Sequence, residues 1–205
     1  LAAVPVSIVG TFAFLHLYDP HFPYEPPAVA REAIRLYREA VGRDSGWSTA
    51  WAGLGKAYVR AYGRAFEIPG LTPDSLLRLS VDAVDRALAA DSTDADAWLA
   101  RVHVSRMVTP TDAGPPLRAV RRALALDSTI AEAWHFLALG QAESGDFDAA
   151  MDNWRRTVQA GPSFTGGLAF FGLGHYWRRQ YDSAAVWADS SLAIEPNFLL
   201  GLSTI

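Results

Sequence analysis

The sequence of 205 residues contains no cysteine, which excludes disulfide bonds, a thiolate nucleophile and cysteine-ligated zinc. Basic residues are not in excess, since 18 Lys and Arg stand against 22 Asp and Glu for a net charge of −4. A generic nucleic-acid binder needs a basic face to displace counterions, so we expect no nucleic-acid partner. Charged residues make up only 20% of the chain and hydrophobic residues 50%. This balance excludes an intrinsically disordered chain and favours a folded, largely helical protein.

Motifs that carry chemistry are also missing. No glycine-rich phosphate loop and no nucleophile elbow occurs. Asp91, Asp94 and Asp96 are spaced like the first ligands of a calcium loop, but Asp96 and Val102 occupy the places that require Gly and Glu. The stretch 16–21 holds two histidines and an aspartate in no known metal-ligand pattern. We therefore predict no catalytic residue, no metal site and no cofactor, and a protein that is not an enzyme.

The chain does contain an internal repeat. Pro162 and Pro196 lie 34 residues apart, and so do Phe147 and Tyr181. A large residue recurs seven positions after each of four turns, at Trp51, Trp98, Trp134 and Leu168. A period in this range is typical of stacked helix pairs.

These residues resemble the tetratricopeptide repeat (TPR) family. Its pattern has a large residue at position 4, Leu at 7, small residues at 8, 20 and 27, aromatic residues at 11 and 24, and Pro at 32. The third full unit matches it with Trp134, Leu137, Ala138, Ala150, Trp154 and Pro162. Gln141 departs from it, as do the serines that replace the terminal Pro in earlier units. The resemblance covers residues 28–205 and implies an all-α fold, a right-handed superhelical solenoid of antiparallel helix pairs.

The helical pattern can be divided at turn and capping residues. Thr72 predicts an N-cap, Thr129 with Glu132 predicts a capping box, and Gly145-Asp146 predicts the end of one helix and the start of the next. The predicted helices cover 28–42, 47–62, 73–90, 94–107, 115–126, 130–144, 147–160, 164–179 and 181–193, and a further one begins near 198.

The two ends of the chain differ from the array between them. Residues 1–27 form a hydrophobic segment and a Pro-rich linker, and residues 1–18 carry no charge. Two alternatives stand for residues 1–18: a membrane anchor, or a soluble helix packed against residues 28–42. With an anchor, the acidic flank favours an extracytoplasmic array. Without an anchor, the sequence is equally compatible with a cytoplasmic protein. Because the chain starts at Leu1 and ends in an apolar stretch, we expect a fragment whose array is truncated at the C-terminus.

The resemblance also implies a binding surface. In TPR proteins, the first helix of each pair lines a concave groove that holds a peptide or protein. The matching positions here include Lys56, Arg60, His103, Arg106, His135, Leu139, Leu173, Tyr176 and Trp177. The set runs from basic to apolar and aromatic, so we expect a protein or peptide partner with an acidic end and an apolar anchor, and no small molecule.

Two features qualify this expectation. The Lys/Asn carboxylate clamp of chaperone-binding members is absent, because its positions in the first full unit hold Ala52 and Lys56. The alternative is that Tyr176 and Trp177 pack against a following unit and that the basic residues are merely solvated.

The layout of the array resembles the C-terminal repeats of large bacterial signalling proteins of the serine/threonine kinase or transcriptional regulator type. The similarity lies in an insertion near residues 64–70 followed by a long second helix. Two functional hypotheses result. The chain is a protein-interaction scaffold, or it is the sensory or regulatory part of a larger membrane-anchored bacterial signalling enzyme such as a serine/threonine kinase.

Overall fold

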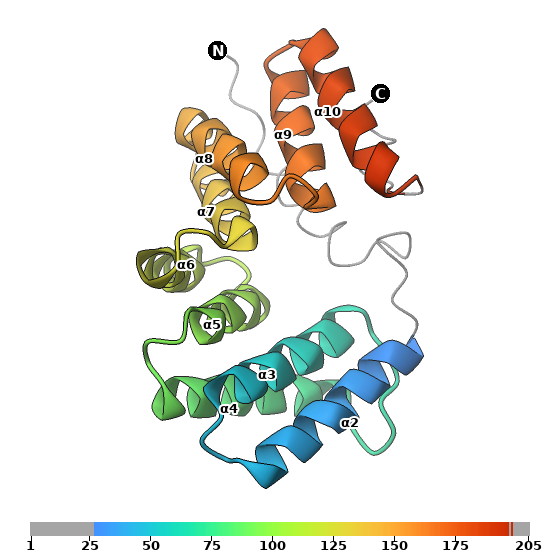
Figure 1. The fold of residues 1–205 in the computed structure, drawn as a ribbon, viewed down its shortest axis with the longest axis vertical. Helices are drawn as coiled ribbons and strands as arrows, with labels where there is room; N and C mark the ends of the chain where they lie inside the picture. Colours follow the sequence, from blue (N-terminus) through green and yellow to red (C-terminus); the bar gives the residue numbers. More distant parts are fainter. Residues whose placement is uncertain (1–26, 197, 199–205) are drawn as a thin grey trace. The chain divides into compact units, whose positions relative to one another are not determined.

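The computed structural model describes residues 27–196 and residue 198, and within these residues the chain forms only α-helices joined by turns (Figure 1). The helices are α2 (Pro27–Arg43), α3 (Ser48–Gly63), α4 (Pro73–Ala90), α5 (Ala95–Val108), α6 (Gly114–Leu126), α7 (Ala131–Glu143), α8 (Phe147–Ala160), α9 (Thr165–Trp177) and α10 (Tyr181–Ile194). Their ends differ by at most two residues from the predicted ones. The helix predicted from residue 198 lies outside the described residues.

The chain divides into two compact units. The N-terminal unit comprises Glu25–Asp127 and contains α2 to α6, whereas Ser128–Ile205 contain α7 to α10 and form the C-terminal unit. Within each unit consecutive helices pair: α3 packs on α4, α5 on α6, α7 on α8 and α9 on α10. The first helices α3 and α5 also pack on each other, and α2 packs on α3.

Small residues set the close packing of the helices in the N-terminal unit. A Cβ atom added to Gly55 on α3 would lie 2.6 Å from Val84 Cγ2 on α4, so only glycine allows this approach. Gly53, two residues earlier, is covered by the ring of Tyr37 on α2. The neighbouring bulky residues Leu54 and Tyr58 are each 3% exposed. This alternation of small and bulky positions is what the repeat pattern predicts.

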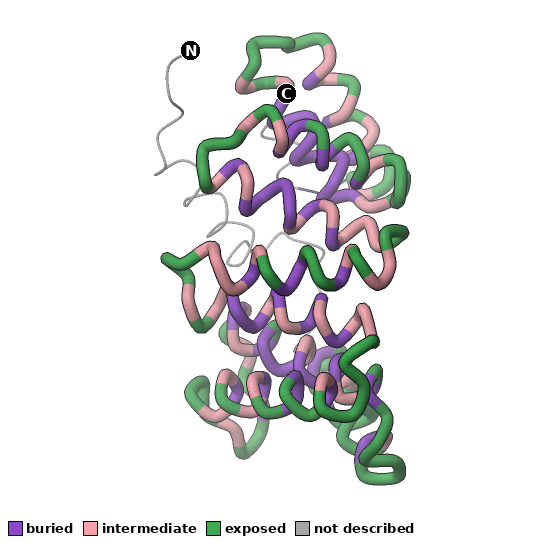
Figure 2. The backbone as a smooth tube through the Cα atoms, turned by 90° about the vertical axis from the view of Figure 1, so that its left-hand side faces the viewer, coloured by how far each residue is buried: buried purple, intermediate pink, exposed green. Residues whose placement is uncertain are grey.

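The core of the C-terminal unit is rich in aromatic rings. Trp154 on α8 is fully buried, and its ring stacks on Phe170 of α9 with 6.0 Å between ring centroids. Met151 packs beside them against Gly174. Every residue from Thr165 to Gly174 of α9 is buried. The tube in Figure 2 shows the general pattern, with exposed residues at the turns and buried ones along the helices.

The helix starts follow the repeat register. The N-cap residues of the four first helices are Trp47, Asp94, Ile130 and Phe164. Each lies four residues before the large residue at position 4 of its unit. The prediction that Thr129 caps α7 is therefore wrong by one residue, because the packing of Trp134 keeps the same register and places Ile130 at the cap.

Other predicted helix ends are confirmed. Thr72 accepts a hydrogen bond from the backbone N–H of Ser75, whose hydroxyl completes the capping box. Gly145 has φ of +85°, and Asp146 accepts from the N–H of Ala149 at the start of α8. Left-handed backbone favours glycine at the end of a helix.

The predicted anchor at residues 1–18 lies outside the described residues. Among the helices that are described, none combines the length and the apolar character needed to cross a membrane.

Candidate functional site

Four of the predicted partner-binding residues lie on the paired first helices of the N-terminal unit. Lys56 and Arg60 belong to α3, and His103 and Arg106 belong to α5. Arg60 is exposed, and the other three side chains are partly exposed. Because α3 and α5 pack side by side, we treat these four residues as one basic surface, named here the α3–α5 surface.

Polar contacts connect the two helices at this surface. Lys56 Nζ lies 3.6 Å from Asp96 Oδ1, and the hydroxyl of Thr49 donates to Asp94 Oδ2 at 3.0 Å. The Lys56 and Asp96 side chains remain 33% and 49% exposed, and an ion pair this exposed contributes at most about 1 kcal/mol. Breaking the Lys56–Asp96 ion pair therefore costs little free energy.

Both arginines of the surface lie near helix ends. Arg60 is in the last turn of α3 and Arg106 in the last turn of α5. The C-terminal end of a helix carries partial negative charge, which stabilises a cation placed there. The two guanidinium groups thus extend the α3–α5 surface from Lys56 toward the C-terminal ends of both helices.

The aspartates that resemble a calcium loop have structural roles instead. Asp91 accepts hydrogen bonds from the N–H and the hydroxyl of Thr93, both at 2.7 Å, and these bonds lower the pKa of its carboxyl. Asp94 caps α5, and Asp96 pairs with Lys56. Within residues 27–196, no group of three or more His, Asp or Glu side chains is placed to hold a metal ion.

The predicted residues of the C-terminal unit divide into exposed and buried sets. Tyr176 at the end of α9 is 47% exposed. Its ring packs edge-on against Tyr181 at the start of α10, with 5.6 Å between centroids, and Tyr181 is 57% exposed. Trp177 is half-buried and packs on Phe147, with a centroid distance of 5.4 Å. Tyr181 opens the second helix α10 and is not among the residues predicted from the sequence, because that prediction used first helices only.

His135, Leu139 and Leu173 belong to the interior. His135 is 1% exposed and its ring packs edge-on against Phe164 and Phe170. Leu139 and Leu173 are each 4% exposed and lie in the same apolar cluster. Through these three side chains, α7 and α9 pack into the core of the C-terminal unit.

Comparison with known proteins gave matches among solved structures only. No family model matches the sequence, and no curated protein matches it. A crystal structure of MamA superposes with a TM-score of 0.55 and 21% identity over 82% of this chain and 90% of MamA. MamA 41-end from Desulfovibrio magneticus RS-1 gives a TM-score of 0.56 at 13% identity over 95% of this chain and 98% of that one. YrrB, described as a TPR protein with an unusual peptide-binding site, gives 0.53 at 19% identity over 98% of this chain and 90% of YrrB.

The chain has the TPR fold. The predicted class, an all-α solenoid built from antiparallel helix pairs, is thereby confirmed. Identities this low establish the TPR fold and nothing further. The resemblance to the TPR arrays of signalling proteins remains a prediction.

Proposed function

We propose that this chain is a protein-interaction scaffold that binds a peptide or protein partner and catalyses no reaction. The observation that carries the proposal is the α3–α5 surface, where two packed first helices carry Lys56, Arg60 and Arg106. First helices are the elements that a TPR solenoid uses to present its concave side. The similarity to YrrB, a peptide-binding TPR protein, supports the same kind of ligand.

The charge of this surface favours an acidic segment of the partner. The Lys56–Asp96 pair at 3.6 Å is exposed enough to exchange for a carboxylate of the partner. Arginine binds carboxylates through two parallel N–H donors, which adds geometric specificity. Arg60 and Arg106 supply this fork, and His103 lies on α5 one turn before Arg106.

The C-terminal unit carries its own candidate contact residues for an apolar segment of a partner. Tyr176 is exposed and Trp177 is half-buried, and aromatic residues of this kind dominate the energy of many interfaces. In this proposal the core side chains of α7 and α9 hold these helices in place. They are His135, Leu139 and Leu173, at 1%, 4% and 4% exposure. Under the alternative, the basic side chains are only solvated and Tyr176 and Trp177 are covered by a following repeat.

Charge reversal separates the two hypotheses. The full chain is titrated by fluorescence anisotropy with labelled peptides of one apolar sequence that end in acidic, neutral or basic residues. For Lys56→Glu with Arg60→Glu we expect the acidic peptide to bind roughly tenfold more weakly or worse, since about 1.4 kcal/mol corresponds to a factor of ten. The matched control is Arg155→Glu on α8, an exposed arginine paired with Asp152, which should leave the affinity within about twofold. An unchanged affinity in the double variant contradicts the proposal.

A second proposal places this scaffold in a larger protein: the sensory or regulatory TPR part of a membrane-anchored bacterial signalling enzyme such as a serine/threonine kinase. Its support is the long connection between α3, which ends at Gly63, and α4, which begins at Pro73. The resemblance to those arrays predicts an insertion at this place. Sequencing the gene upstream of Leu1 tests it. A kinase or cyclase domain there supports the proposal, and an open reading frame without one removes it.

A further inference from the structure

The insertion between α3 and α4 builds a cavity that the repeat pattern does not require. The connecting residues 64–72 include two in left-handed conformations, Ala65 with φ of 51° and Gly70 with φ of 78°. These let the chain fold back over the end of α3. The loop, the end of α3, the start of α4 and Arg31 of α2 line a partly open pocket of about 430 Å³. All of these elements belong to the N-terminal unit.

The loop is held in place by its own backbone. Phe66 N–H donates to the carbonyl of Ala61 at 2.9 Å, and Leu71 N–H donates to that of Ile68 at 3.0 Å. Ile68 is itself 7% exposed, which anchors the middle of the loop in the core. The cavity is therefore preformed, and its volume falls within the range of roughly 300–1,000 Å³ typical of ligand pockets.

The interior of the cavity is apolar. Leu76 and Ile68, at 2% and 7% exposure, line it and belong to the core of the N-terminal unit. Tyr62, Phe66 and Leu71 are half-buried and complete the walls. Such a surface favours an aromatic or aliphatic group, which gains free energy by leaving water.

Two charged residues flank this apolar interior. Arg31 Nε donates to the backbone carbonyl of Glu67 at 2.9 Å, which uses one of the five guanidinium donors and fixes the plane of the group. Glu67 also lines the cavity, and among the described residues no hydrogen bond or ion pair holds its carboxylate. A prepositioned guanidinium fork binds a carboxylate with little loss of side-chain entropy, whereas the Glu67 side chain can turn toward solvent.

We propose that this cavity, which we name the insertion pocket, binds a small amphipathic carboxylate. The aromatic or medium-length aliphatic part of the ligand fills the space between Phe66, Leu71 and Leu76, and its carboxylate pairs with Arg31. This ligand class departs from the expectation that the chain binds no small molecule. The site is separate from the α3–α5 surface, so its test is independent of the test of the proposed scaffold function. The same chemistry is offered by a free carboxylic acid and by the C-terminus of an apolar peptide.

The test uses the full chain and four probes: 4-phenylbutyrate, its amide, and a short peptide ending in Phe with a free or an amidated C-terminus. Binding is followed by amide chemical shifts in ¹⁵N spectra. We expect the free carboxylates to shift resonances of residues 61–76 and to bind about tenfold more tightly than the amides. Shifts from the acid alone assign a free carboxylic acid as the ligand, and shifts from the peptide alone assign a C-terminus. Equal binding of acids and amides, shifts elsewhere in the chain, or no binding by any probe overturns the proposal.

Three variants test the role of the charges. Arg31→Gln should weaken carboxylate binding about tenfold, and Glu67→Gln should strengthen it, because it removes the competing charge while keeping the backbone carbonyl that holds Arg31. Arg43→Gln at the other end of α2 is the matched control and should change nothing. Arg31 is exposed, so the fold should survive, and the shifts of unliganded Arg31→Gln report any loosening of the loop. If Glu67→Gln fails to bind more tightly while Arg31→Gln binds normally, Arg31 does not recognise the carboxylate and the proposal is wrong.

Discussion

The indole N–H of Trp134 donates a hydrogen bond to the backbone carbonyl of Ser128, 2.8 Å away at the turn before α7. The same bond joins Trp51 to Ser45 and Trp98 to Ser92, at 2.9 Å in both units. In these three units the tryptophan at position 4 thus joins the first helix, α3, α5 or α7, to the turn that precedes it. This bond gives a physical reason for the regular spacing between the Asp-Ser turns and the tryptophans.

Replacing Trp134 by Phe should lower the free energy of unfolding by about 1 kcal/mol, because the Ser128 carbonyl loses its donor. The ring also lies under the guanidinium of Arg156, 4.8 Å from its centroid, and Phe retains part of that contact. Urea denaturation measures the change. Trp187→Phe is the control, since Trp187 is half-buried and makes no hydrogen bond to another described residue. Equal losses in the two variants would show that the bond to Ser128 adds nothing.

Replacing Gly55 by Ala should destabilise the N-terminal unit. The new Cβ would lie 2.6 Å from Val84 Cγ2 and 3.3 Å from the backbone oxygen of Ser80, and overpacking of this kind costs about 1–3 kcal/mol. The matched control is Gly42→Ala in α2, where a Cβ meets nothing within 4 Å. There the higher helix propensity of Ala should stabilise the protein by up to about 1 kcal/mol. Thermal melts of both variants should therefore shift in opposite directions, and a shared sign contradicts the packing argument.

Replacing Gly145 by Ala tests backbone conformation without a steric clash. Gly145 has φ of +85°, and a Cβ there would meet nothing within 4 Å. The left-handed conformation alone should cost about 1–2 kcal/mol for Ala. Gly145→Asn should lose less stability, because Asn adopts the left-handed conformation more readily than Ala. The urea midpoint should therefore be highest with glycine at position 145, lower with asparagine and lowest with alanine. Any other order would contradict this account of the turn.

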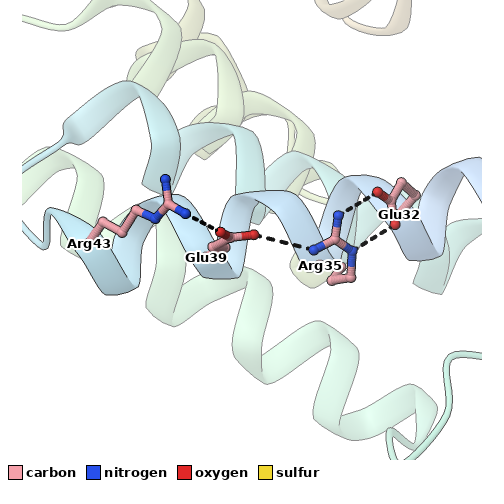
Figure 3. Close-up of polar contacts among 4 residues, drawn as sticks. All are labelled: Glu32, Arg35, Glu39 and Arg43. Carbon is pink, nitrogen blue, oxygen red and sulfur yellow. Dashed lines mark hydrogen bonds and ion pairs between the residues drawn. The ribbon is translucent and has the colours of Figure 1, made fainter.

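The ion-pair row along α2 allows a prediction about pH (Figure 3). Arg35 donates to both carboxylate oxygens of Glu32, at 2.6 and 2.8 Å, and this hydrogen bonding lowers the pKa of Glu32. Arg35→Gln should return the pKa of Glu32 to its ordinary value. Arg43→Gln should leave it unchanged, because Arg43 pairs with Glu39. A carboxyl-detected NMR titration measures both.

The sign of the effect on stability follows from the direction of the Glu32 shift. A pKa that is lower in the folded state stabilises the protein above the pKa of the unfolded state, and this contribution disappears as the pH falls through the folded-state pKa. The side chains of Arg35 and Glu32 are 58% and 55% exposed, so added salt should reduce the shift. If neither Arg35→Gln nor added salt changes the pKa of Glu32, the pair does not form in solution.

Much of the fold could be predicted from the sequence, because its signals are local. Helix α4 was predicted with the observed ends, since Thr72 caps it and Pro73 fits its first position. The cap of α7 was predicted one residue too early, because a Thr-x-x-Glu motif outweighed the repeat register that places Ile130 there. Short-range rules resolve helices and turns, and packing decides between neighbouring cap positions.

The candidate site could be predicted only in part. The family pattern identifies which residues lie on first helices, and Lys56 and Arg60 do lie on α3, where Lys56 is partly exposed and Arg60 is exposed. It does not tell which of these positions face solvent, and Leu139 and Leu173 are buried. Exposure depends on neighbouring helices, which no single helix pattern contains.

By itself, the sequence determined the helices, the turns and the thirty-four-residue repeat, because caps, glycines and the spacing of large and small residues act within a few turns of helix. Only the tertiary structure decided the contacts between distant residues. It paired Lys56 with Asp96, placed His135 in the core, and folded the insertion back against Arg31 to form the insertion pocket. These contacts depend on how whole helices and loops pack in space, and residue spacing along the chain does not contain that information.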